Sequence, residues 1–361
     1  MRRRALADFD WWLLLAALAL VAIGLLEIYS STAHTRYAGL HIRQFYWVLL
    51  GLAIMWTVVF VDYHLIIEQT PVLYIIGVLM LLVVLVVGQT ISGSKRWLGY
   101  GAFSIQPAEI FKIILILTLA RYFSERRLRT LTWVDMMQVG VLAAIPFVLI
   151  LMEPDLGTAL TFFPILGVGL WLGGIRWKML ATLALGFVLI LPLGWFVLKP
   201  YQRARLMTFT HSDADPLGRG YQIAQSKIAV GSGGLLGKGF LQGSQNRLGF
   251  VPYRHTDFIF SVVGEEQGFL GVLVSLLLFI FVIFRSIQHA RSARDRYGVF
   301  LVMGVAALLA FHVVVNVGMV IGLMPVTGIP LPFVSSGGSS ILSTFMALGL
   351  VLNVRMRRYA N

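Results

Sequence analysis

The stretch "WWLLLAALALVAIGLLEIYS", residues 11–30, decides the fold of this chain. An α-helix needs about 20 mostly apolar residues to cross the hydrocarbon core of a bilayer, and this run has that length. The preceding "MRRR" resembles the start of a signal peptide. The apolar run is too long for the core of a signal peptide, however, and it lacks a convincing cleavage site. We therefore predict a first membrane span.

The rest of the chain repeats this pattern. Of its 361 residues, 58% are hydrophobic and 12% are charged, whereas soluble domains carry about 25% charged residues. There is no cysteine, which excludes a disulfide framework, a thiolate metal site and a cysteine nucleophile. The pattern predicts one all-α, polytopic membrane domain over residues 1–361. Its ten expected helices are 11–30, 44–61, 71–88, 108–121, 134–152, 156–173, 177–197, 266–285, 297–321 and 336–354.

Lysine and arginine set the expected orientation. With the N-terminus inside, the inner segments are rich in basic residues, whereas the short outer loops hold only Arg36, Arg43, Lys95 and Arg96. This asymmetry follows the positive-inside rule and predicts that both termini are cytoplasmic. Residues 198–265 are too polar to span and are expected to form one long extracytoplasmic loop between the seventh and eighth helices. The net charge of +13 does not indicate nucleic-acid binding, because the basic residues lie in short loops between spans.

Acidic side chains gather at the expected outer edge of the membrane. Lys112 follows one of them, Glu109, at the i, i+3 spacing of a single helix face. His312 and Asn316 share a face in the outer half of the ninth helix. Charges at membrane depth are costly and usually face a cavity or a partner. The clustering therefore predicts a functional site near the outer leaflet. The acidic residues are Glu109, Glu153, Asp155, Asp257, Glu265 and Glu266.

Several of these residues also have a purely structural interpretation. Glu109 and Lys112 can form an ion pair that locks two helices together. Asp155 can cap the helix that follows it. Asp257 can be a solvated loop acid or the cap of the eighth helix, and His312 can be a hydrogen-bonded core residue. The residues alone leave both kinds of interpretation open.

The glycine-rich stretch "VGSGGLLGKGFLQGSQNRLGF", residues 230–250, invites comparison with a phosphate-binding loop. It is not a Walker A motif, because no Ser or Thr follows the lysine and no strand precedes it. One interpretation is a flexible loop. The other is a flexible backbone that approaches an anionic head group, helped by side chains from the same stretch. The candidates are Lys238, Gln242, Gln245 and Arg247.

The stretch "MPVTGIPLPFVSSGGSS", residues 324–340, carries a second signal. Its prolines, at 325, 330 and 332, forbid a regular helix and favour an extended segment. Gly337 and Gly338 then come early in an apolar helix, where close backbone contact is the usual reason for glycine. We expect a re-entrant or capping segment, which is compatible with a role in lining a substrate site.

Taken together, the motifs resemble the SEDS family (shape, elongation, division and sporulation). The matching segments follow the family order over nearly the whole chain. The form "PVTGIPLPF" favours the elongation branch over the division branch. One departure is visible: family members commonly have an acidic residue just before "HTDF", where this chain has "PYRHTDF". The matching segments are "KRWLGYGAFSIQPAEIFK" (95–112), "EPDLGTAL" (153–160), "GSGGLLGKGFLQGSQNRLGF" (231–250), "HTDFIFSVVGEEQGFLG" (255–271) and "NVGMVIGLMPVTGIPLPFVSSGGSS" (316–340).

The resemblance implies a peptidoglycan glycosyltransferase of the bacterial cytoplasmic membrane that polymerises lipid II during cell-wall elongation. It implies a partner, a class B penicillin-binding protein with a single span and transpeptidase activity. The family's best-supported catalytic aspartate corresponds to Asp257, and three supporting residues correspond to Glu109, Lys112 and Asp155. We expect lipid II, this transpeptidase and membrane lipids as partners.

Elementary chemistry agrees with that activity. A sugar hydroxyl is a poor nucleophile until a base removes its proton, and a positioned carboxylate can do so. The departing lipid diphosphate needs a cation to hold its charge. An external oxygen site suits Mg²⁺ or Mn²⁺, with Asp257 as the candidate ligand. Two other functions remain as hypotheses, a lipid II flippase and a non-catalytic scaffold for a transpeptidase. The flippase needs a polar path open to both faces, and the scaffold does not explain the outer carboxylates.

Overall fold

The structure, a computed structural model, describes residues 8–33, 35–91, 94–100, 103–126, 130–197 and 219–358. Within these residues seven helices are long and apolar enough to cross a membrane: α2, α3, α5, α7, α15, α16 and α17. All ten helices expected from the sequence have a helical counterpart. The elements are α2 (Trp11–Thr32), α3 (Leu40–Phe60), α4 (Tyr63–Glu68), α5 (Thr70–Val87), β1 (Gln89–Ile91), β2 (Ser94–Tyr100), β3 (Phe103–Ile105), α6 (Pro107–Glu125), α7 (Trp133–Met152), α8 (Leu156–Leu160), α9 (Phe162–Leu172), α10 (Trp177–Val197), α12 (Arg219–Ser232), α13 (Ser244–Arg247), α14 (Ile259–Glu266), α15 (Gly268–Arg291), α16 (Arg296–Val320) and α17 (Gly338–Met356).

Helix α6 forms the centre of the bundle. It packs against α5, α9, α16 and α17, and its residues are buried almost all round, from Pro107 to Phe123. A helix with no solvent-facing side can keep a charged residue only where a partner compensates it. Glu109 and Lys112, both on α6, are therefore required to find partners inside the bundle.

Three short strands, which the sequence analysis did not predict, lie between α5 and α6. They form an antiparallel sheet in the order β1-β2-β3, with Thr90 paired to Lys95 and Leu98 paired to Ile105. Two of the strands have only three residues, too few for a recognisable alternation. Strand β2 of this sheet places Arg96 in contact with Asp155, in the turn between α7 and α8.

One expected helix is interrupted, and the expected long loop contains short helices. The helix expected over 156–173 is broken at Thr161 into α8 and α9, because Pro164 has no N–H to donate to the Leu160 carbonyl. The loop expected over 198–265 contains α12, α13 and α14 in its described part, and residues 198–218 lie outside the described residues. Helix α12 was missed because its buried side chains, Ile223, Ser226 and Ala229, form too short an apolar face to recognise in a largely polar segment.

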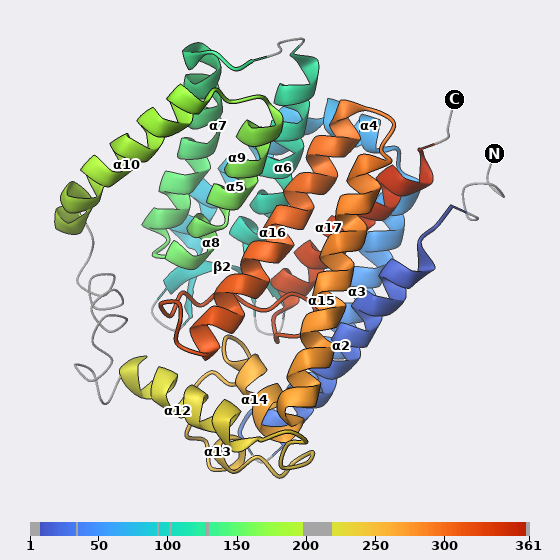
Figure 1. Cartoon of the computed structure of the whole chain (residues 1–361), viewed down its shortest axis with the longest axis vertical. Helices are drawn as coiled ribbons and strands as arrows, with labels where there is room; N and C mark the ends of the chain where they lie inside the picture. The colour runs from blue at the N-terminus through green and yellow to red at the C-terminus, as the bar shows by residue number, and fades with distance from the viewer. Residues whose placement is uncertain are drawn as a thin grey trace.

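The two ends of the bundle differ (Figure 1). The N- and C-termini lie at the same end, and α12, α13 and α14 lie at the opposite end. This arrangement agrees with the expectation that the termini share one side of the membrane and that the segment before α15 lies on the other side.

Residues 321–337 contain no helix, as the prolines predicted. Many of these residues are buried, so the segment turns back into the bundle instead of lying free at its end. At Gly24 on α2, an added Cβ would lie 2.6 Å from the Val334 carbonyl oxygen, so α2 packs directly on this backbone. At Gly338 an added Cβ would lie 2.5 Å from the Trp47 ring, which confirms the expected close contact.

Candidate active site

Asp257 lies half-buried in the segment 253–258, directly before α14. Asn316 on α16 donates from Nδ2 to the Asp257 carbonyl oxygen at 2.9 Å. The N-cap of α15, the eighth expected helix, is Gln267, and that of α14 is Phe258, so Asp257 is at the N-cap of neither helix. An added Cβ at Gly328 would lie 3.5 Å from Asp257 Oδ2, which places the carboxylate beside the proline-rich segment.

Two further hydrogen bonds fix the same segment. Ser335 Oγ donates to the Thr256 carbonyl at 2.6 Å, and the Ser336 amide donates to the His255 carbonyl at 3.0 Å. Burial, together with the positive charge of Arg254, lowers the pKa of His255 to about 4. Its ring is therefore neutral at neutral pH and adds no positive charge beside Asp257.

Helix α16 holds the proline-rich segment from the other side. Asn316 Nδ2 also donates to the Ile329 carbonyl at 2.8 Å, and His312 Nδ1 lies 3.0 Å from the Pro330 carbonyl. His312 Nε2 lies 3.3 Å from Lys112 Nζ. Because the ammonium group can only donate, Nε2 accepts, and the ring proton is on Nδ1 and donates to Pro330.

Glu109 and Lys112 lie behind this contact and pair with each other. Lys112 Nζ is 2.9 Å from Glu109 Oε1, and Ser343 Oγ donates to Glu109 Oε2 at 3.0 Å. The two charged residues are only 4% and 1% exposed, which supports the structural ion-pair interpretation. We call Glu109, Lys112, His312, Asn316 and Ser343 the buried network. It supports the backbone on which Asp257 is held.

Asp155 confirms its predicted role as a helix cap. Its carboxylate accepts from the Thr158 amide at 3.1 Å and from Thr158 Oγ1 at 2.9 Å, at the start of α8. Gln106 Nε2 also donates to it, and Arg96 Nη1 lies 3.2 Å from Oδ2. The sequence analysis recognised Arg96 only as a loop residue, because nothing in its spacing connects β2 with this turn.

Glu153, two residues earlier, lies just beyond the end of α7. It is completely buried, and neither carboxylate oxygen has a hydrogen-bond partner among the described residues. Burial and the negative charge of Asp155 raise its pKa to about 8, against a smaller opposite effect of Arg96. Glu153 is therefore mostly protonated at neutral pH.

The glycine-rich stretch is packed against the α14–α15 junction, which corrects the expectation of a flexible loop. An added Cβ at Gly233 would lie 1.9 Å from the Gly264 carbonyl oxygen. Gly237 has φ +79°, and an added Cβ there would lie 2.1 Å from the Glu266 carbonyl oxygen. Both glycines are needed because two backbones meet without space for a side chain.

The side chains proposed from this stretch have different surroundings. Lys238 Nζ pairs with Glu265 Oε1 at 2.7 Å, and the Gln245 and Asn246 amides donate to the same carboxylate at 2.8 and 3.0 Å. Gln242 is exposed. Lys238 thus anchors the stretch, and a direct contact of Lys238, Gln242 or Gln245 with substrate stays a prediction.

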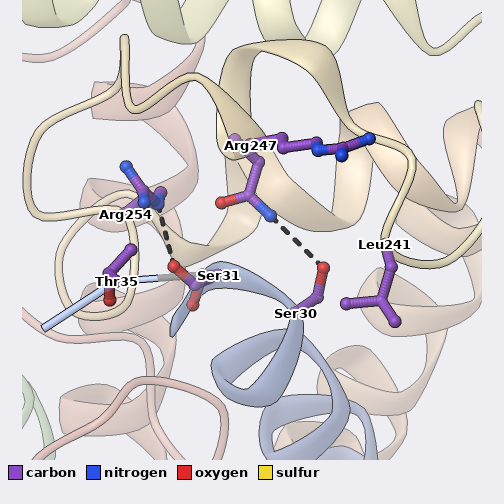
Figure 2. Close-up of a pocket in the computed structure, with 7 residues that line it drawn as sticks. Ser30, Ser31, Thr35, Leu241, Arg247 and Arg254 are labelled. Carbon is purple, nitrogen blue, oxygen red and sulfur yellow. Dashed lines mark hydrogen bonds between the residues drawn. The ribbon is translucent and has the colours of Figure 1, made fainter. Parts of the chain in front are cut away.

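A pocket opens between the end of α2 and this stretch (Figure 2). Ser30 Oγ donates to Glu266 Oε1 at 2.6 Å, and Asn246 Nδ2 lies 3.3 Å from the same hydroxyl. Arg254 Nε donates to the Ser31 carbonyl at 3.0 Å. We call this site the arginine pocket. Its lining residues are Ser30, Ser31, Thr35, Leu241, Asn246, Arg247 and Arg254.

The described residues contain no group of three or more His, Cys, Asp or Glu side chains that could hold a metal ion. The described residues therefore do not form a metal site made only of protein ligands. Mg²⁺ commonly keeps several waters and binds through one or two carboxylates plus substrate phosphates. The half-buried Asp257 carboxylate fits that second arrangement.

Comparison with known proteins gives one consistent result. The family model FTSW_RODA_SPOVE, described as "Cell cycle protein", matches residues 9–360. Peptidoglycan glycosyltransferase RodA of Treponema pallidum is 34% identical, covering 99% of this chain and 100% of that protein. Stage V sporulation protein E of Bacillus subtilis is 37% identical, with 97% and 98% covered.

A solved structure agrees with the sequence relatives. It concerns the structural coordination of polymerization and crosslinking by a peptidoglycan synthase complex. One of its chains superimposes with a TM-score of 0.85 at 35% identity, covering 98% of this chain and 99% of that chain. The described helices therefore have the architecture of that chain, and the family model spans nearly the whole sequence. The chain belongs to the SEDS family, the family of FtsW, RodA and SpoVE.

Proposed function

We propose that this chain polymerises lipid II into glycan strands at the outer leaflet during cell-wall elongation, with Asp257 as the general base. As a member of its family, it is a multi-pass membrane protein and a peptidoglycan glycosyltransferase of cell-wall synthesis. The observation that carries the role of Asp257 is its placement. Its carboxylate is half-buried on a segment whose backbone is fixed by Asn316, Ser335 and Ser336.

The chemistry assigns a limited task to the protein. An ionised Asp257 accepts the proton of the acceptor sugar hydroxyl as that oxygen attacks the anomeric carbon of the donor. The bond between this carbon and the lipid diphosphate breaks in the same displacement, so no covalent enzyme intermediate is needed. A bound divalent cation, Mg²⁺ or Mn²⁺, would supply charge stabilisation for the departing diphosphate, with Asp257 as its protein ligand.

The elongation role is the finer part of the proposal. The form "PVTGIPLPF" at 325–333 supports it, and so does the similarity to RodA of Treponema pallidum. A sporulation relative matches at a similar identity, so identity alone does not choose between the branches. Expression in cells depleted of their own elongation polymerase tests the role. Restored rod shape supports it, and restored septation without rod shape assigns the chain to division.

A transpeptidase is the partner that we infer for this chain. The described residues form a helical bundle with short outer elements and no separate domain that could crosslink peptides. We infer a class B penicillin-binding protein with a single span, in line with the synthase complex to which this chain is structurally similar. Co-purification of the two proteins tests the inference, and polymer yield with and without the partner shows whether the partner activates the polymerase.

One experiment separates the three functions considered. Purified protein is incubated with lipid II, and the product is resolved by chain length. Glycan polymer supports the glycosyltransferase. Transfer of labelled lipid II between leaflets without polymer supports a flippase, and partner binding without either activity supports a scaffold.

A further inference from the structure

The arginine pocket contains two cations that the buried network does not use. Arg254 is half-buried and Arg247 is exposed. Among the described residues, neither has a carboxylate within ion-pair distance, and none of the seven lining residues is acidic. A charge that is partly withdrawn from water, as on Arg254, is usually paired, whereas the exposed Arg247 does not require a partner. An anionic ligand would supply the missing partner.

Other partly buried cations of the chain show the usual arrangement. Arg96 pairs with Asp155 at 3.2 Å, Arg285 with Asp10 at 2.6 Å and Lys238 with Glu265 at 2.7 Å. Burial lowers the pKa of Arg254, which shows that the protein around it does not fully compensate its charge. Arg254 differs from these three cations, and among the described residues it shares the lack of a carboxylate partner with the partly buried Lys95 and Arg355.

Glu266 lies close to the pocket, but its charge is already compensated. Its oxygens accept from Ser30 Oγ at 2.6 and 2.7 Å, from the Leu241 amide at 3.0 Å and from Asn246 Nδ2 at 2.9 Å. These bonds also fix the orientation of the Asn246 amide. Asn246 Oδ1, buried and without a hydrogen-bond partner in the described residues, is left to accept from a ligand hydroxyl, N–H or water.

Size restricts what the pocket can hold. Its enclosed volume is about 10 Å³, which is room for about one water molecule, and it is open to solvent on one side. A phosphate group would therefore bind at the mouth of the pocket, with the rest of a lipid-linked disaccharide outside it. Arg254 also lies three residues before Asp257 in the sequence, so the pocket and the proposed base share one segment.

We propose that the arginine pocket binds the diphosphate of a lipid-linked sugar, with Arg247 and Arg254 contacting phosphate oxygens and Asn246 Oδ1 accepting from the attached sugar. Arginine is suited to this because its planar fork can donate two parallel hydrogen bonds to a phosphate. The inference rests on the proposed function for the choice of substrate. The pocket lies at α2 and α13, whereas the buried network lies at α6, α16 and α17, so the two regions serve the same reaction from different elements.

The test is direct binding, so that it does not depend on turnover. Undecaprenyl diphosphate is titrated into the full chain in nanodiscs of neutral lipid, and Arg247→Gln is compared with wild type. Loss of one charge-assisted hydrogen bond should weaken binding by about 10-fold. Arg247→Lys, which keeps the charge but loses the fork, should give a smaller loss. Arg36→Gln is the matched control, because Arg36 contacts Tyr37 at the same end of the bundle and does not line the pocket.

Further arms identify the source of the phosphate. Inorganic pyrophosphate that competes in wild type, and competes less in Arg247→Gln, supports diphosphate recognition without the lipid chain. Nanodiscs of phosphatidylglycerol that compete as well as undecaprenyl diphosphate would overturn the assignment, because they would show a nonspecific anionic surface. Equal binding by wild type and Arg247→Gln would also overturn it.

Polymerisation is measured on the same preparations. Arg247→Gln should lower kcat/KM for lipid II by about 10-fold, because the contact with the diphosphate is lost whether that diphosphate stays on the acceptor or departs from the donor. If wild type binds undecaprenyl diphosphate through Arg247 but forms no polymer, the proposed function fails and the pocket assignment stands. If wild type forms polymer and the variant binds equally well, only the pocket assignment fails.

Discussion

The buried network and the arginine pocket both contact the segment that carries Asp257, but they differ in how completely their polar groups are paired. In the network Lys112 contacts both Glu109 and His312, and Glu109 also accepts from Ser343. In the pocket, Arg247 and Arg254 lack a carboxylate among the described residues. The charged groups of the network are paired, although Asn316 Oδ1 has no hydrogen-bond partner among the described residues. Paired charges favour one geometry, whereas unpaired cations at an open site are available to a ligand. The comparison distinguishes the residues that hold the base, Asp257, from the residues that we propose bind the substrate.

The largest effect is expected from breaking the network at its ion pair. Lys112→Met leaves Glu109 as an uncompensated buried charge and should cost about 3–5 kcal/mol of stability, seen as a loss of folded protein after extraction. Glu109→Gln combined with Lys112→Met removes both charges and should restore folded yield. Turnover measured on the double variant then decides the role of the pair. Restored turnover means that it is structural, and folded but inactive protein means that it also acts in the reaction.

We expect polymerisation to require a divalent cation, with Asp257 as its protein ligand. Chelation should reduce polymerisation by at least about 10-fold, because the departing diphosphate then loses its counter-charge. Mg²⁺ or Mn²⁺ added back should restore the rate. Full activity in excess chelator would assign leaving-group stabilisation to side chains alone, with Arg247 and Arg254 as the first candidates.

A smaller effect is expected at Asn316, which connects the network to Asp257. Asn316→Ala removes the donor for two carbonyls, Asp257 and Ile329, and should lower kcat by about 10–100-fold by displacing the carboxylate. Asn353→Ala is the matched control. Asn353 is equally buried and donates to the carbonyls of Val58 and Val61, near the end of α17 that lies away from Asp257. Equal losses of kcat in the two variants would reduce the role of Asn316 to general stability.

A pH-dependent change of stability is expected at Glu153. Its pKa of about 8 in the folded chain lies above the ordinary 4.5, so folding favours the protonated form. That stability is complete below about pH 4.5 and is lost as the pH rises toward 8, by up to about 1.4 kcal/mol per pH unit. Glu153→Gln should therefore raise Tm at pH 8 and leave it nearly unchanged at pH 5.

The control for this prediction is Glu125→Gln, since Glu125 is an exposed carboxylate that pairs with Arg121. It should show no comparable gain at pH 8. If Glu153→Gln raises Tm equally at both pH values, packing and not protonation explains the change.

The helices were predictable because their apolar runs are long and need only local information. Pro164 marks the break between α8 and α9, although the apolar run continues through it. The strands of three residues and the polar helix α12 gave too little periodicity to recognise. Secondary structure could thus be predicted for segments that are buried in lipid or protein along their whole length.

The candidate site was predictable in part. The i, i+3 spacing indicated the Glu109–Lys112 pair, and the position before a helix indicated the Asp155 cap. The partners Arg96, Ser335 and Ser343 could not be found, because each approaches from an element far away in the sequence. Of the residues that line the arginine pocket, the sequence indicated only Arg247 as a site residue. The lining residues on α2 are uncharged, so no pattern connected α2 with the glycine-rich stretch.

The central claim is that Asp257 is the base of glycan polymerisation, and Asp257→Asn tests it most directly. Asparagine keeps the size of the side chain but removes its charge and basicity. Folded yield and binding of undecaprenyl diphosphate are measured first, and both should match wild type. Asp257→Glu should also be impaired, because a displacement of about 1 Å can cost about 10²-fold.

Initial rates of polymer formation from lipid II then give the answer. Our account predicts that Asp257→Asn lowers kcat by about 10²–10⁴-fold. Polymerisation by Asp257→Asn at a rate close to wild type would contradict the assignment of Asp257 as the base.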